Sequence, residues 1–161
     1  MIIQFRMLRE VKTLRQDKAM RALEAARRAL SEAEERAEAL SRLVEESAAS
    51  LPDRERALFT PILGKAIGTE DVDEVKTRVL ALIEEHQRLS DRRDRARDHV
   101  RRCHERLSAA RVELRKREAE CEKIDTLLDE MWRGAQDALT ASEEAEIEDV
   151  FSRPRGMGGL H

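Results

Sequence analysis

Apolar residues recur at alternating steps of three and four through the second half of the chain, between Val72 and Ala145. The stripe consists of Val72, Val75, Val79, Leu82, Leu89, Ala96, Val100, Cys103, Leu107, Ala110, Leu114, Cys121, Ile124, Leu128, Met131, Ala135, Ala138 and Ala145, interrupted only by His86, Arg93, Arg117 and Ser142. A repeat averaging 3.5 residues is typical of a left-handed coiled-coil seam. At about 1.5 Å per residue, residues 72–138 would form a helix roughly 100 Å long. Such a helix needs a partner along its seam.

A first long helix is predicted over residues 1–49, because no glycine or proline occurs before Pro52. Its apolar stripe steps by four and three through Ala19, Leu23, Ala26, Leu30, Ala33, Ala37, Leu40 and Val44. Met7, Val11 and Leu14 follow the same rhythm, but the phase slips across residues 15–18. We interpret the slip as a stutter, which relaxes the supercoil locally.

The pattern breaks over residues 50–71, which we predict to be the tip between two helices. Ser50-Leu51-Pro52-Asp53 resembles a helix stop and restart. Thr60-Pro61 and the glycines at 64 and 68 interrupt the chain again. Three apolar residues, Phe59, Ile62 and Leu63, either seal this turn or bind a partner. Asp71 is expected to cap the next helix together with Glu74.

A second helix is predicted over residues 72–140, with Gly134 weakening but not breaking it. Thr140 and Glu143 resemble a capping box that restarts a short acidic helix over residues 141–151. Ile147, Val150 and Phe151 share one face of that helix. Residues 152–161 are expected to be disordered. On this interpretation residues 1–151 form a single domain.

The distribution of charge predicts how the two helices meet. Residues 1–30 carry eight Lys and Arg against three Asp and Glu, whereas residues 118–149 carry two against twelve. Residues 31–50 carry two against six, and residues 88–117 carry twelve against five. Antiparallel pairing places basic beside acidic in both halves, and many weak pairs together select orientation. We therefore predict an all-α fold, a long antiparallel two-helix coiled-coil hairpin, as a monomer, with a homodimer as the alternative.

Composition argues against several other classes of protein. Charged residues make up 40% and aromatic residues 2%, which favours an extended helical protein over a globular core. The net charge of −3 gives no electrostatic case for nucleic acid. We expect no membrane insertion, no metal, no cofactor and no catalytic residues, since the chain contains no long apolar run, ligand cluster, phosphate loop or activated nucleophile. Cys103 and Cys121 are expected to be reduced thiols of a cytoplasmic protein.

The second helix outlasts the first by roughly twenty residues, so some seam residues at one end lack an internal partner. Trp132 lies near this open end and either packs onto Phe5 or Met7 or anchors an interface. The candidate partner-contact residues are Phe5, Met7, Phe59, Ile62, Leu63, Trp132, Ile147, Val150 and Phe151.

This charge-rich hairpin resembles the FliJ/YscO family of type III secretion stalk proteins, with the nearest local likeness in the acidic segment 143–151 after Met131-Trp132. The resemblance implies a non-enzymatic rod that enters a hexameric export ATPase, couples it to the export-gate protein and meets secretion chaperones. It also implies a cytoplasmic protein that associates peripherally with the membrane-bound export machinery. The alternatives are a coiled-coil adaptor that dimerises to bridge two proteins, and a chaperone that uses the apolar tip.

Overall fold

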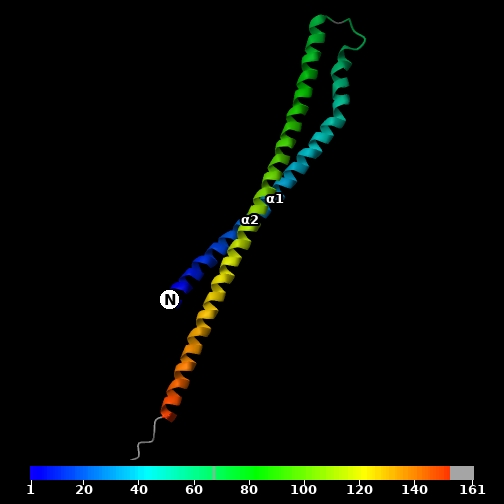
Figure 1. The fold of residues 1–161 in the computed structure, drawn as a ribbon. Coiled ribbons are helices and arrows are strands. Elements are labelled where there is room, and N and C mark those ends of the chain that lie inside the picture. Colours follow the sequence, from blue (N-terminus) through cyan, green and yellow to red (C-terminus); the bar gives the residue numbers. More distant parts are fainter. Residues whose placement is uncertain (67, 153–161) are drawn as a thin grey trace, which may run out of the picture. The chain divides into compact units, whose positions relative to one another are not determined.

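The computed structural model describes residues 1–66 and 68–152, and every regular element within these ranges is helical. Helix α1 (Ile2–Phe59) leads through a short 3-10 turn, η1 (Thr60–Ile62), into helix α2 (Thr69–Ser152) (Figure 1). Over the described residues the protein is therefore all-α, as predicted. Apart from Ser152, which ends α2, the segment predicted to be disordered lies outside the described residues.

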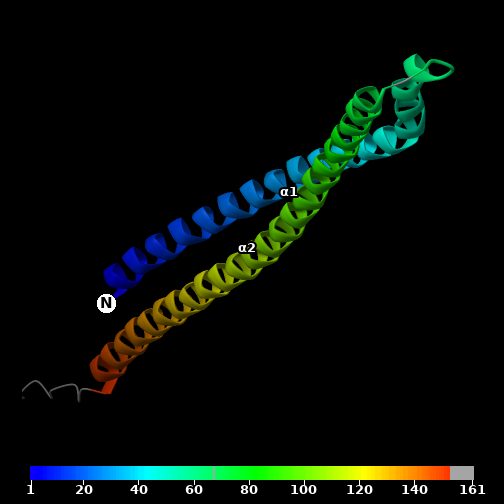
Figure 2. The ribbon, with the colours of Figure 1, turned by 90° about the horizontal axis from the view of Figure 1, so that it is seen from above.

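Helix α1 continues ten residues beyond the predicted end at residue 49, with Pro52 inside it. Proline removes one backbone donor and its ring crowds the carbonyl four residues earlier, so it bends a helix without necessarily ending it. Both views show α1 changing direction in its cyan part (Figures 1 and 2). Just before the proline, the Ser47 carbonyl accepts hydrogen bonds from Ser50 Oγ at 3.2 Å and Arg54 Nη2 at 3.4 Å. The predicted stop at residues 50–53 is therefore a bend.

The connection between the helices is shorter than the predicted tip of residues 50–71. Phe59 ends α1, and the amide of Leu63 bonds to the carbonyl of Thr60 at 3.4 Å to close η1. Gly64 follows with φ = 78°, a left-handed conformation that glycine adopts without steric cost. The second helix then begins at Thr69.

Two predicted caps in α2 are wrong. The amide of Val72 bonds to the carbonyl of Gly68, so Asp71 lies inside the first turn of α2, where its charge still favours the helix dipole. Glu74 forms an ion pair with Arg78 at 2.7 Å instead of completing a capping box. At the other end α2 runs unbroken through Thr140 to Ser152, because nothing in that stretch forbids helix and its threonine costs little. The acidic segment is the end of α2 and not a separate helix.

The helices divide into two compact units. The turn unit is residues 21–112 and contains the connection; the terminal unit is residues 1–20 together with the end of the chain from residue 113. In the turn unit the apolar stripes are buried as predicted. Its buried hydrophobic side chains are Leu23, Ala33, Ala37, Leu40, Val44, Val75, Cys103 and Leu107, of which Cys103 is fully buried. Cross-helix contacts join Ser47 Oγ to His86 Nδ1 at 2.9 Å and Glu34 Oε1 to His104 Nε2 at 3.5 Å. Residues further along α1 therefore contact residues earlier in α2, so the segments are antiparallel within this unit.

The terminal unit departs from the predicted seam on α1. Ala19 is buried, and the half-buried positions before it are Ile2, Phe5, Lys12, Thr13 and Gln16. These positions continue the phase of the Ala19–Val44 stripe without a stutter. Met7, Val11 and Leu14 consequently lie on the opposite face and are exposed by 62%, 44% and 64%. The predicted phase slip is wrong, because the buried and half-buried positions of residues 2–19 keep the phase of the later stripe, although Lys12, Thr13 and Gln16 are polar.

Candidate partner-binding surfaces

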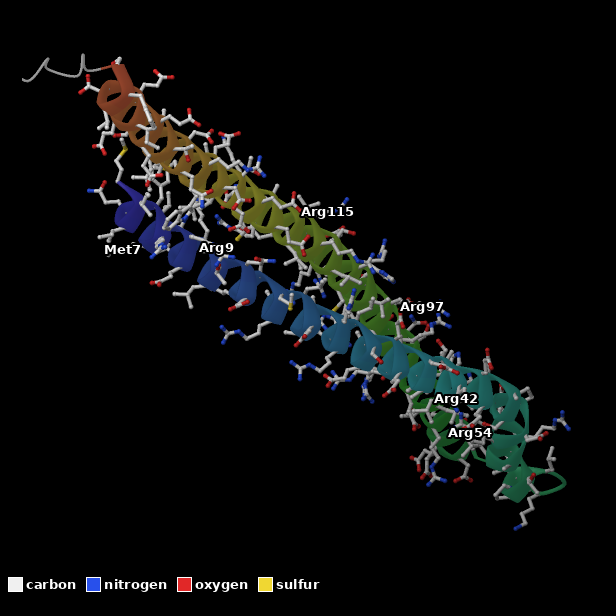
Figure 3. All side chains as sticks on the ribbon, turned by 90° about the horizontal axis from the view of Figure 1, so that it is seen from below. Met7, Arg9, Arg42, Arg54, Arg97 and Arg115 are labelled. Atoms are coloured by element: carbon white, nitrogen blue, oxygen red, sulfur yellow. The ribbon has the colours of Figure 1, made fainter. Side chains whose placement is uncertain are left out.

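Ion pairs hold α1 to α2 within the terminal unit. Arg9 of α1, labelled in Figure 3, donates a hydrogen bond from Nε to Asp125 Oδ1. Lys12 Nζ lies 3.2 Å from Glu120 Oε2. Arg117 Nη1 approaches the same Glu120 oxygen at 3.1 Å. The α2 positions Cys121, Ile124 and Leu128, which lie near these acids in the sequence, are buried as predicted. The contact therefore combines apolar positions of α2 with ion pairs between cationic residues of α1 and acidic residues of α2.

These contacts change the pKa values of the groups involved. The hydrogen bond from Lys12, followed by the one from Arg117, lowers the pKa of Glu120 below its ordinary value. The hydrogen bond to Asp125 raises the pKa of Arg9 in turn. Because these side chains are reached by solvent, the pairs contribute modestly and depend on salt.

The face of α1 that points away from α2 in this unit is apolar. Ile3, Met7, Val11 and Leu14 recur at steps of four, four and three, and all four are exposed. Arg15 and Lys18 flank this stripe and form no ion pair with the described residues. We call the four residues the α1 outer stripe. An apolar helix face of this kind is typical of a surface that another helix covers.

Beyond Met131 every described residue of α2 is exposed. Arg6 lies over the ring of Trp132 with its guanidinium carbon 5.4 Å from the centroid, a cation–π contact. The segment 137–152, which we call the overhang, has six acidic residues and no basic ones. Glu143, Ile147 and Val150 line an open hollow of about 390 Å³ on it. The predicted contact residues Ile147, Val150 and Phe151 thus lie together on an acidic, exposed helix end.

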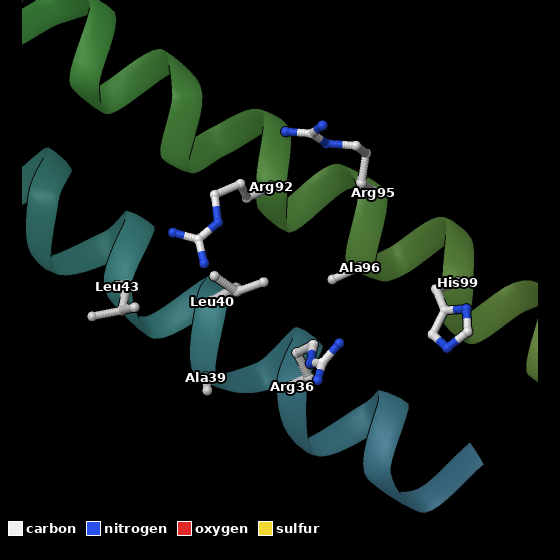
Figure 4. Close-up of a pocket in the computed structure, with 8 residues that line it drawn as sticks. All are labelled: Arg36, Ala39, Leu40, Leu43, Arg92, Arg95, Ala96 and His99. Atoms are coloured by element: carbon white, nitrogen blue, oxygen red, sulfur yellow. The ribbon is translucent and has the colours of Figure 1, made fainter. Parts of the chain in front are cut away.

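The turn unit carries a groove of about 570 Å³ between its two helices. Its lining is Arg36, Ala39, Leu40 and Leu43 of α1 with Arg92, Arg95, Ala96 and His99 of α2. Leu40 and Arg92 extend into the space between the helices (Figure 4). The three arginines form no ion pair with the described residues, which leaves a cationic rim over an apolar floor. This groove was not predicted from the sequence, where the available signal is the apolar Leu43 close to the seam residue Leu40.

The predicted tip residues separate in the structure. Ile62 is half-buried, whereas Leu63 is 70% exposed. Phe59 lines a small hollow with Val79 and Leu80 of α2. Ile62 therefore helps to close the connection, and Phe59 and Leu63 leave an apolar surface beside it.

The described residues contain no cluster of three or more His, Cys, Asp or Glu that could hold a metal ion. Cys103 and Cys121 are free, buried thiols, and Cys103 Sγ lies 3.6 Å from His99 Nε2. Within the ranges that the structure covers, no helix is both long and apolar enough to cross a membrane.

The described residues thus define a class of protein: an all-α protein of two long helices with exposed apolar and charged faces. The family model for the type III secretion protein YscO matches residues 5–153. The chain belongs to this family, and the resemblance inferred from the sequence is confirmed. No curated protein and no solved structure shows significant similarity to the chain.

Proposed function

We propose that the protein is the non-enzymatic central stalk of a type III secretion apparatus, a single antiparallel two-helix coiled-coil hairpin that works in the cytoplasm at the membrane-associated export machinery. The family match supports a role in type III secretion. The observation that carries the stalk role is the length of the helices, 58 residues in α1 and 84 in α2, with contact surfaces at the connection and at the open end. Stiff helices can transmit order or torque between proteins that bind their ends.

On this proposal the chain enters a hexameric export ATPase and links it to the export-gate protein and to secretion chaperones. Trp132 and the overhang offer one contact surface in the terminal unit, and the half-buried Phe5 of the same unit is a further candidate. Phe59 and Leu63 offer another at the connection. Exposed aromatic and aliphatic side chains of this kind are frequent anchors of protein interfaces.

The test is to mix the purified chain with the export ATPase of the same secretion system. We expect a complex in gel filtration and a change in the rate of ATP hydrolysis. Phe59→Glu and Phe151→Glu should weaken binding at their respective ends, whereas Val112→Glu, on an exposed residue outside both surfaces, should not. Absence of any complex and of any change in hydrolysis would reject the stalk role.

A coiled-coil adaptor that dimerises to bridge two proteins is the second candidate. The α1 outer stripe favours it, because an apolar face that the chain itself leaves uncovered suits a helical partner. A complex of the chain with two secretion proteins that forms without the ATPase would support the adaptor.

A further inference from the structure

We propose that two copies of this chain associate through their terminal units, each placing its overhang on the α1 outer stripe of the other. The inference uses the overhang, which the proposed stalk function also uses, and the α1 outer stripe, which that function leaves uncovered, but it does not depend on the stalk function. It adds to the pairing of α1 with α2 within each copy, which it leaves unchanged.

The first observation is the reversed character of α1 in the terminal unit. Arg9 and Lys12 face α2, whereas Ile3, Met7 and Leu14 face away from it. Four apolar side chains in one helical stripe stay in contact with water unless something covers them, which is unfavourable. Their outward position leaves the stripe available to a partner.

The second observation is the spacing of the overhang. Leu139, Glu143, Ile147 and Val150 recur at steps of four, four and three, the same steps as the α1 outer stripe. Helices packed side by side in parallel keep one register only when their stripes have the same spacing. A constant offset of 136 residues places Ile3 opposite Leu139, Val11 opposite Ile147 and Leu14 opposite Val150. Met7 then meets the aliphatic stem of Glu143, and the hollow lined by Glu143, Ile147 and Val150 receives side chains.

The charges of the overhang and of the residues beside the α1 outer stripe also favour a second copy of the chain as the partner. The overhang has six acidic residues and no basic ones, so its occupant should be cationic. Arg15 and Lys18 border the outer stripe without an ion pair among the described residues, and Glu146 forms none either. With the same offset, residue 10 of α1 lies opposite Glu146, and Arg15 lies five residues further along α1. Residues with this spacing commonly form ion pairs between the helices of a parallel coiled coil.

The proposed dimer has closed twofold symmetry. Each copy contributes one α1 outer stripe and one overhang, so two identical contacts form around the twofold axis. Both stripes and both overhangs are then covered, and none remains to bind a third copy. Within the terminal unit the overhang continues α2 past the residues that meet α1, and it is free to meet a second copy. We therefore expect a dimer and no larger assembly.

The experiment is sedimentation equilibrium of the intact chain over a range of concentrations. We expect reversible association to a dimer. Met7→Glu and Val150→Glu should each raise the dissociation constant about ten-fold or more, because each places a charge in an apolar contact. Leu80→Glu is the matched control, since Leu80 is 60% exposed and Met7 62%, and it should leave the dissociation constant unchanged. Circular dichroism of each variant checks that helix content is retained.

Two further arms identify the contact. A mixture of Val11→Cys and Ile147→Cys chains, oxidised together, should give a disulfide-linked heterodimer, whereas Val11→Cys mixed with Leu80→Cys should not. Arg15→Glu should weaken the dimer, and Glu146→Arg added to it should restore part of the loss. A chain that stays monomeric throughout, a dimer equally weakened by Leu80→Glu, or cross-linking only in the control mixture would each overturn the proposal. These results are independent of whether the chain binds an ATPase, so the stalk role and the dimer can fail separately.

Discussion

The turn unit and the terminal unit are built from the same two helices but pair them by different means. In the turn unit, small and medium apolar side chains of α1 such as Ala33, Ala37 and Leu40 are buried. In the terminal unit, α1 turns Arg9 and Lys12 towards α2 and leaves the α1 outer stripe exposed. The inner face of a helix can thus change along its length from apolar to a mixture of apolar and cationic side chains. The turn unit therefore buries its apolar stripe and stabilises the fold, whereas the terminal unit leaves the α1 outer stripe available for packing.

The largest expected difference between the two units is in how much the truncation of one leucine lowers the free energy of unfolding. Leu107→Ala removes a buried side chain of the turn unit and should lower the free energy of unfolding by about 2–5 kcal/mol. Leu14→Ala removes an exposed side chain of the terminal unit and should change it by less than about 0.5 kcal/mol. Urea denaturation followed by circular dichroism, at a concentration where the chain is monomeric, measures both. Equal losses for the two variants would show that Leu14 is buried after all.

High salt should act on one unit more than on the other. At about 1 M salt the screening length falls to about 3 Å, which weakens the exposed Arg9–Asp125 and Lys12–Glu120 pairs. Burial of apolar side chains in the turn unit is not weakened in this way. Hydrogen exchange should therefore quicken in residues 1–20 and stay nearly constant in residues 30–44. A uniform change along α1 would contradict the distinction between the units.

A smaller effect should appear on acidification. Because Lys12 and Arg117 lower the pKa of Glu120, this carboxylate stabilises the terminal unit at pH values above its ordinary 4.5. The stabilisation should disappear as the pH falls below that value and through the lowered pKa. Protection of the amides in residues 1–20 should decrease over this range, and Glu120→Gln should lose part of the protection already at pH 7. If Glu120→Gln and the unaltered chain behave alike at neutral pH, Glu120 does not hold α1.

Much of the fold was predictable because α2 has a long and nearly uninterrupted repeat. Its positions from Val72 to Met131 are buried or half-buried, and those beyond Met131 are exposed, as expected for a helix that outlasts its neighbour. Regular spacing over many turns leaves few alternative faces, so a sequence pattern alone identifies the buried one.

The incorrect predictions fall at positions where two features of the sequence favour different structures. Met7, Val11 and Leu14 have the spacing of a seam, but the ion pairs of Arg9 and Lys12 and the phase set by Ala19 determine which face of α1 is inside. Pro52 resembles a stop, yet neighbouring turns keep the helix intact and turn the break into a bend. The cationic groove was missed because it is formed by residues of two helices, and the periodicity of one helix does not reveal which side chains of another will lie beside it.

The most direct test of the account is the facing of α1 in the terminal unit. In a chain with Cys103→Ala and Cys121→Ala, the pair Lys12→Cys and Glu120→Cys is treated with a short bis-maleimide, and the pair Leu14→Cys and Glu120→Cys is treated alike. Mass spectrometry of the monomer fraction counts intrachain cross-links. The account predicts efficient cross-linking from position 12 and little from position 14, since Lys12 faces Glu120 and Leu14 is 64% exposed on the far side. Efficient cross-linking from position 14 with little from position 12 would place the apolar stripe inside and contradict it.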